Sequence, residues 1–163
     1  MAYGGDMIRK YTVALIQMNT QNNKGENLKQ ACAWIDEAAA RGAKLICFPE
    51  VMNLIGRNVG EGGGREKIPG YTTEILCRKA KEHGVYIQGG SVTEDISEEY
   101  PGEQRSANTS VLISPEGEIL ASYRKLHMFD ITLADGTPFR ESDRVRPGDS
   151  VVTVETELGV MGL

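Results

Sequence analysis

The first part of the chain alternates apolar runs and polar breaks in a pattern that predicts a strand, a helix and a second strand. Tyr11 to Met18 is mostly apolar and is interpreted as a buried strand. Between Leu28 and Ala39 the apolar side chains recur at helical spacing, and Asn22 or Asn23 can cap the start of that helix. Lys44 to Phe48 is a second apolar strand. Strand, helix and strand in this order are typical of a βαβ unit with parallel strands.

A second helix and a third strand follow. Thr72 to His83 has helical spacing, and Gly84 is a plausible stop for that helix. Val85 to Gly89 reads as a third strand, which Ser91 and Val92 can extend. The side chains expected on the inner face of the second helix are Ile75, Leu76, Lys79 and Ala80. Alternating strands and helices indicate the α/β class.

Two hairpins follow in the second half. Ser110 to Ile113 and Glu118 to Tyr123 flank a Ser-Pro-Glu-Gly turn, which predicts an antiparallel pair. Val151 to Val154 and Gly159 to Leu163 are expected to form a final pair of strands. We expect no internal repeat.

Three polar stretches are expected to lie on the surface. Asn53 to Gly70 is rich in glycine and charge and predicts a long loop, which in a compact domain is usually functional or mobile. Thr93 to Gln104 is acidic and predicts a surface excursion, and Asp130 to Asp149 is expected to be irregular.

Length and charge narrow the class of protein. The chain has 163 residues, which suits one domain, and residues 1–10 are expected to be a flexible leader before a domain at residues 11–163. The net charge is −5 and no basic block is present, which argues against nucleic acid or an anionic membrane as a partner. Residues 1–10 also lack the apolar core of a secretory signal, and no apolar run is long enough to span a bilayer.

The cysteines favour a reduced, cytosol-like compartment. Cys32, Cys47 and Cys77 are odd in number and widely spaced, without the spacing of metal ligands. We expect no disulfide framework, no metal and no cofactor. Because they stand among aliphatic residues, all three are expected to be core residues, with Cys47 buried and unreactive.

Two charged residues occupy positions where chemistry is plausible. Glu50 directly follows an apolar strand, and ligands of open α/β sheets bind at the carboxyl ends of strands. Partial desolvation there would suit Glu50 to act as a general base, although a solvated turn glutamate fits the position as well. Lys125 follows the second hairpin strand and could stabilise an oxyanion, but a lysine after Arg124 is more often a solvated surface residue. His127 could be a ligand or base, although a packed core histidine is the more common outcome, and Glu141 carries no independent signal.

Six short sequence blocks, taken together, indicate a protein family far more specifically than any single residue does. In order along the chain they are Val13–Gln17, Gly42–Glu50, Ile68–Gly70, Gly89–Ser91, Asn108–Ser110 and Tyr123–Asp130. Their order and spacing resemble the nitrilase superfamily of carbon–nitrogen hydrolases, from about Tyr11 to Leu163. The later blocks Phe139–Ser142 and Pro147–Asp149 are similar to the branch of omega-amidases and deaminated-glutathione amidases.

The resemblance implies a four-layer αββα sandwich and an amidase that releases ammonia from a small carboxylic amide through a Glu-Lys-Cys triad. Glu50 matches the general base, Lys125 the oxyanion-stabilising lysine, and Glu141 a second active-site glutamate. The nucleophilic cysteine of the family follows a strand like Gly159–Leu163, and the sequence contains none there, so we expect a chain truncated before the second half. The resemblance also implies a homo-oligomer for a full-length parent.

Two functions from different classes therefore remain open. One is a piece of a thiol-dependent amidase, and the other is a non-catalytic fragment or partner-binding module of the same family. In either case we expect Glu50, Lys125 and Glu141 to lie together at one end of the sheet. We also expect an inactive, marginally folded chain with exposed apolar surface around Val111–Ile113 and Val151–Val154.

Overall fold

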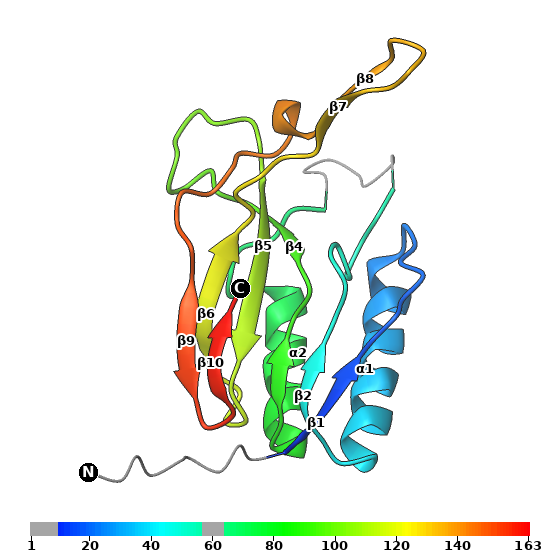
Figure 1. Cartoon of the computed structure of the whole chain (residues 1–163), viewed down its shortest axis with the longest axis vertical. Coiled ribbons are helices and arrows are strands. Elements are labelled where there is room, and N and C mark those ends of the chain that lie inside the picture. Colours follow the sequence, from blue (N-terminus) through cyan, green and yellow to red (C-terminus); the bar gives the residue numbers. More distant parts are fainter. Residues whose placement is uncertain (1–9, 57–63) are drawn as a thin grey trace, which may run out of the picture.

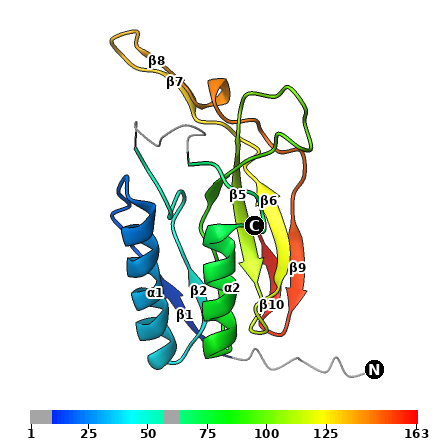
Figure 2. The same cartoon turned by 180° about the vertical axis from the view of Figure 1, so that it is seen from behind.

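A computed structural model describes residues 10–56 and 64–163 as a six-stranded mixed sheet with two helices on one face (Figures 1 and 2). The predicted α/β class is confirmed. Most of the expected leader, residues 1–9, and part of the expected long loop, residues 57–63, lie outside the described residues. The elements in chain order are β1 (Thr12–Leu15), α1 (Lys24–Ala40), β2 (Ala43–Cys47), α2 (Tyr71–His83), β3 (Tyr86–Gln88), β4 (Val92–Glu94), β5 (Ala107–Ile113), β6 (Ile119–Arg124), β7 (Asp130–Thr132), β8 (Pro138–Arg140), a 3₁₀ turn (Glu141–Asp143), β9 (Thr153–Thr156) and β10 (Gly159–Gly162).

The parallel half of the sheet is the predicted βαβ arrangement. β1 pairs with β2 and β2 with β3, both in parallel, and α1 and α2 cover one face of these strands (Figure 2). The Asn23 side chain accepts a hydrogen bond from the Glu26 N–H and so caps α1, as predicted. Gly84 ends α2 in the left-handed region, with φ 62°. Within the described ranges, neither helix has the length and apolarity to cross a bilayer.

The core lies between the two helices and the sheet. Its apolar side chains come from the inner faces of α1 and α2 and from β2, β3 and β5, at the spacing the sequence predicted. Fully buried members are Ala31 and Ile35 of α1, Leu76 and Ala80 of α2, and Ile46, Ile87 and Ile113 of the strands. Cys32, Ala39 and Ile75 are only half-buried, because they lie at the margins of the helix faces.

The first strand is not the buried strand that its composition indicated. β1 is an edge strand that pairs only with β2 among the described residues. Ala14 packs against the core, so its neighbours point to the opposite face, where Val13 is 43% and Leu15 80% exposed. An apolar run identifies a strand, but it does not reveal whether both faces are covered.

The predicted extension of the third strand is a separate strand. β3 and β4 pair antiparallel with different ends of β5, and residues 89–91 interrupt them. Gly90 lies in the left-handed region at φ 60°, which breaks the extended backbone between the two strands. The acidic stretch after it is also not wholly a surface excursion, because Glu94 and Ile96 are buried.

The hairpin predictions hold, with corrections at their margins. β5 and β6 form the predicted antiparallel pair, as do β9 and β10. The stretch expected to be irregular, Asp130 to Asp149, contains the β7–β8 hairpin and the 3₁₀ turn that holds Glu141. That hairpin projects away from the body of the sheet (Figure 1).

The expected apolar exposure is wrong for Val111–Ile113 and holds only in part for Val151–Val154, where Val152 and Val154 are half-buried. Val111, Leu112 and Ile113 are at most 1% exposed, because β5 is a central strand between β6 on one side and β3 and β4 on the other. Val151 is 78% exposed, and Val160 in β10 is 70% exposed.

Candidate functional site

Three charged side chains that lie far apart in the sequence meet at one end of the sheet. The Lys125 ammonium donates to a carboxylate oxygen of Glu50 at 3.0 Å and to the Glu141 carboxylate at 3.0 and 3.2 Å. The predicted juxtaposition of these residues is therefore confirmed. One cation between two carboxylates is a compact arrangement that can hold its members at fixed positions.

The strand ends bring Glu50 and Lys125 together. Glu50 lies just beyond the carboxyl end of β2, and Lys125 directly follows β6. The Lys125 N–H donates to the Asn108 carbonyl at 2.9 Å, and the Lys125 carbonyl accepts from the Gly148 N–H at 2.9 Å. The backbone of Lys125 is thus held on both sides, which leaves its side chain free to point toward the two carboxylates.

Glu141 is positioned by the segment that precedes the β7–β8 hairpin. Its carboxylate accepts a hydrogen bond from the Phe129 N–H at 2.6 Å, and its side chain is only 15% exposed. Ser142 is fixed to Asp130 by bonds from its backbone N–H and its hydroxyl. The long excursion between Lys125 and Glu141 therefore returns to the site because the two ends of the hairpin are bound to each other.

Asn108 is a further member of the cluster, for which the sequence gave a motif but no role. Its side-chain amide donates to the Glu50 carboxylate at 2.5 Å, and its backbone carbonyl holds Lys125. Asn108 therefore contacts both members of the central ion pair. An asparagine in a strand does not by itself indicate a functional site. Asn108 contributes to this one only because β2 and β6 end beside it.

The ammonium of Lys125 is stabilised in its charged form. Partial burial of the side chain disfavours the charge, but the hydrogen bonds and charges of Glu50 and Glu141 outweigh that effect, so the pKa of Lys125 is raised. Glu50 is less enclosed than expected, with 56% of its side chain exposed. The desolvated carboxylate that the sequence suggested is therefore not observed.

The cluster opens into a cavity of about 430 Å³. Part of its wall is polar, and there the Gln88 amide donates to the Ser110 hydroxyl at 2.7 Å. Gly162 and Leu163 close one side of it. The other lining residues are Phe48, Glu50, Gly90, Ser91, Asn108, Tyr123 and Lys125. A cavity of this size suits a small molecule with hydrogen-bonding groups.

The remaining candidates do not join the site. His127 is exposed, so it is neither the packed core residue that the sequence favoured nor a member of the cavity wall. Cys32, Cys47 and Cys77 are free thiols, and none of them lines the cavity. All three are half-buried rather than fully buried, which corrects the core assignment, although Cys77 packs against the core.

Burial nonetheless affects the reactivity of these thiols. It raises the pKa of Cys47, and burial is likewise the largest cause of the raised pKa of Cys32 and Cys77. We predict that iodoacetamide at neutral pH alkylates all three more slowly than it alkylates free cysteine, because less thiolate is present. Mass spectrometry of the folded and urea-unfolded chain measures this, and rapid labelling of Cys47 in the folded chain would contradict it.

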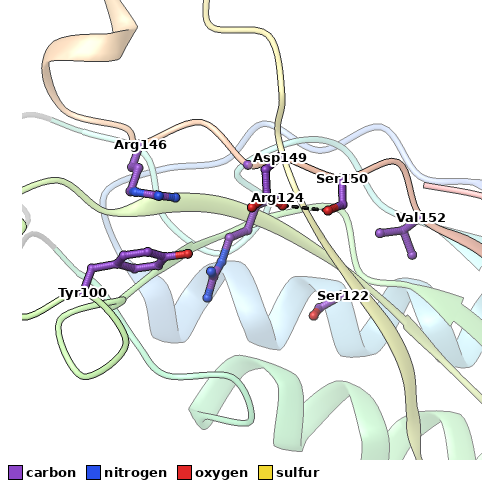
Figure 3. A pocket seen from close by; sticks show the side chains of 8 residues that line it. Tyr100, Ser122, Arg124, Arg146, Asp149, Ser150 and Val152 are labelled. Carbon is purple, nitrogen blue, oxygen red and sulfur yellow. Dashed lines mark hydrogen bonds between the residues drawn. The ribbon is translucent and has the colours of Figure 1, made fainter.

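A second cavity, of about 290 Å³, lies beside Arg124 and Arg146 (Figure 3). The Arg146 guanidinium stacks on the Tyr100 ring, 3.8 Å from its centroid. Arg124 binds the carboxylates of Glu94 and Glu99. The charge of Arg124 is thus already paired with carboxylates of the chain, and these ion pairs fasten β4 and the segment after it to β6.

A third cluster joins the two helices. The carboxylates of Asp36 and Glu82 lie near His83, close enough together to ligate one ion. The Lys79 ammonium already pairs with both carboxylates, and His83 Nε2 lies 2.6 Å from Asp36. These contacts explain the cluster as a set of ion pairs that joins α1 to α2.

Comparisons with known proteins identify the family. Human omega-amidase NIT2 is 38% identical over 153 residues, which is 94% of this chain and 53% of that protein. The chain spans about half the length of the curated relatives it matches. Among solved structures, the Caenorhabditis elegans NitFhit protein superposes with a TM-score of 0.76 at 23% identity, covering 91% of this chain and 36% of that one.

The fold of the nitrilase superfamily is also confirmed. Saccharomyces cerevisiae Nit3, a member of branch 10 of that superfamily, superposes with a TM-score of 0.72 at 25% identity. The superposition covers 92% of this chain and 53% of Nit3, so the sheet and its helix layer match part of the larger fold. The family model for carbon–nitrogen hydrolases matches residues 12–163. This chain therefore belongs to the carbon–nitrogen hydrolase family.

Proposed function

We propose that the chain supplies the acid–base part of an amidase site that acts on the C–N bond of a small carboxylic amide. The observation that carries the proposal is the Lys125 ammonium, 3.0 Å from carboxylate oxygens of both Glu50 and Glu141 at the wall of a cavity of about 430 Å³. The similarity to human omega-amidase NIT2 supports the choice of an amide.

Each residue has a role that its position supports. Glu50 is the general base, since its carboxylate reaches into the cavity and is held by Asn108 and Lys125. Lys125 stabilises the negative charge that develops on the amide oxygen, because its raised pKa keeps the ammonium charged at neutral pH. Glu141 positions Lys125, since it is anchored by the Phe129 N–H and accepts from the ammonium.

The chemistry requires a thiol nucleophile. A thiol gives its proton to Glu50 and attacks the amide carbon, and the C–N bond then breaks as the proton passes to the leaving ammonia. Water next attacks the thioester, releasing the carboxylic acid and restoring the thiol. Because none of the three cysteines of the sequence lines the cavity, we propose that this chain is inactive by itself and that a thiol outside it completes the site.

The position of the cysteines also keeps a second function open. A non-catalytic module of the same family would bind a ligand or partner through the cavity without turning it over. The two functions share the binding step and differ only in hydrolysis, so binding and ammonia release need separate measurements.

The compartment and the assembly of the protein are proposed separately. We place the protein in the cytoplasm, which the free state of Cys32, Cys47 and Cys77 supports. We also propose that a full-length parent is a homo-oligomer, and that neither nucleic acid nor membrane is its partner, as the net charge of −5 suggests.

Binding of an amide tests the site directly. The monoamide of a small dicarboxylic acid should shift the NMR signals of the Lys125 and Asn108 side chains in a saturable way. Lys125→Met should abolish the saturable shift of the Asn108 signal, because the ammonium proposed to contact the carbonyl oxygen is gone. Lys44→Met, which replaces an exposed lysine of β2, serves as the control. The proposal is wrong if the amide leaves these signals unchanged at millimolar concentration, or if both variants bind equally.

A further inference from the structure

The turn that follows Glu50 is strained. Val51 has φ 53°, and it is the one non-glycine residue with positive φ among residues 10–56 and 64–163. A β-branched side chain in the left-handed region crowds its own backbone, so such a conformation persists only where the surroundings enforce it. Because Val51 is next to the proposed general base, we asked which partner holds it in this conformation.

Ser91 is that partner. Its hydroxyl oxygen accepts a hydrogen bond from the Val51 N–H at 2.9 Å, and its carbonyl accepts from the Met52 N–H at 3.2 Å. Ser91 is only 6% exposed, so water cannot readily replace its hydroxyl. Ser91 thus fixes two successive peptide groups of the turn, the first through its hydroxyl and the second through its backbone carbonyl.

The neighbouring glycine shows how closely the two segments approach. Gly90 has φ 60°, and a Cβ atom built on it would lie 2.1 Å from the Pro49 carbonyl oxygen. No side chain fits in that space. The break between β3 and β4 therefore places the Ser91 hydroxyl against the turn that carries Glu50.

Little packing fixes the orientation of the Glu50 side chain. Its side chain is 56% exposed, and in the described chain its carboxylate accepts hydrogen bonds from Asn108 and Lys125. An exposed carboxylate on a free turn would sample several rotamers. When the peptide between Glu50 and Val51 is held, the Cα–Cβ bond of Glu50 points toward the cavity.

We propose that Ser91 is a positioning residue for Glu50, acting through the Val51 peptide group. The significance of this role for catalysis rests on the proposed function, whereas the effect on the geometry of Glu50 and Lys125 can be measured without turnover. Ser91 contributes no proton and contacts no reacting atom in this role.

The first test replaces Ser91 by alanine and measures the pKa of Lys125 by NMR titration of its side chain. Without the hydroxyl, Val51 relaxes from φ 53° and the Glu50 carboxylate moves away from the ammonium. The pKa of Lys125 should then fall toward that of a solvated lysine, since Glu141 alone still pairs with it. Hydrogen exchange of the Val51 amide should rise about fivefold to tenfold, as expected for one lost hydrogen bond.

A second variant separates positioning from general destabilisation. Val51→Gly removes the strain, because glycine adopts positive φ without cost. Combined with Ser91→Ala it should restore the pKa of Lys125 to the wild-type value. It also provides a folded protein should the single variant fail to fold.

The matched control is Ser114→Ala. Ser114 is 4% exposed, and its hydroxyl likewise accepts from backbone N–H groups, those of Glu116 and Glu118, in the turn at the opposite end of β5. This variant should leave the pKa of Lys125 unchanged. An equal fall in Ser114→Ala, no fall in Ser91→Ala, or no recovery in the double variant would each overturn the proposal for Ser91. Failure of amide binding alone would overturn the proposed function and leave the role of Ser91 in place.

Discussion

The 163-residue chain should release ammonia from a small carboxylic amide about 10⁴- to 10⁶-fold more slowly than an intact omega-amidase. Glu50 and Lys125 can polarise a carbonyl group without a thiol, but they cannot form a thioester. Without a thiol at the cavity, as we propose, the covalent route is closed and only the modest contribution of binding and electrostatics is left. A coupled ammonia assay with human omega-amidase NIT2 as the reference measures the difference.

The control for this prediction is the chain's own cysteines. Cys47 precedes Glu50 by three positions and is the thiol nearest to it in sequence, but burial raises its pKa and it does not line the cavity. Cys47→Ser should therefore leave the background rate unchanged. Ammonia release that is saturable, and that Cys47→Ser or a thiol reagent abolishes, would show that the chain is an enzyme as it stands.

The parts of the fold that local patterns determine were predictable. Apolar spacing placed the inner face of α1, Asn23 marked its start, and Gly84 marked the end of α2. These features depend on interactions within a few residues along the chain. The antiparallel β5–β6 pair was predictable for the same reason, because its turn sequence lies between two apolar runs.

Features that depend on distant partners were not predictable from such patterns. The stretch that begins at Thr93 reads as acidic surface, yet Glu94 is buried because Arg124, 30 residues later, supplies two hydrogen bonds to it. Leu15 reads as buried, yet it is exposed because nothing in the described chain covers that face of β1. In both cases the outcome is decided by what lies opposite in space.

The candidate site also contains residues that local sequence patterns indicate and residues that they do not. Glu50 and Lys125 could be singled out because each follows a predicted strand, although only the family resemblance favoured them over ordinary surface residues. Glu141 and Asn108 had no local signal. Their importance comes from the ammonium of Lys125 and from the ends of β2 and β6, which only the folded chain brings together.

Arg124→Met should cost about 3–5 kcal/mol of unfolding free energy at neutral pH, the typical penalty for removing one partner of a buried ion pair. Arg124 donates from Nε and Nη2 to Glu94 at 2.8 Å each, and the Thr109 hydroxyl donates to the same carboxylate at 2.6 Å. The Glu94 side chain is 11% exposed, so removal of Arg124 leaves a nearly buried charge with one donor. Since small domains are stable by only about 5–15 kcal/mol, this is a large share of the total.

The matched control is an exposed arginine in an ion pair. Arg41→Met breaks the pair with Glu37 on the surface of α1, where the two side chains are 77% and 46% exposed, and should cost less than about 0.5 kcal/mol. Urea unfolding measures both variants. Adding Glu94→Gln to Arg124→Met should recover part of the loss, because an uncharged amide then replaces the carboxylate that lost its partner.

The pH dependence of unfolding shows whether Arg124 stabilises the fold through its ion pairs or through the packing of its side chain. The pKa of Glu99 is lowered to about 2, from an ordinary value of 4.5, and the hydrogen bond from Arg124 is the largest cause, followed by that from Tyr100. A carboxyl with a depressed pKa stabilises the fold above its unfolded pKa, and this contribution is lost as the pH falls from about 4.5 to 2. The wild-type chain should therefore lose stability through this range more steeply than Arg124→Met, whose Glu99 lacks the partner. Parallel pH profiles for the two proteins would mean that the Arg124 cluster stabilises β4 and β6 by packing alone.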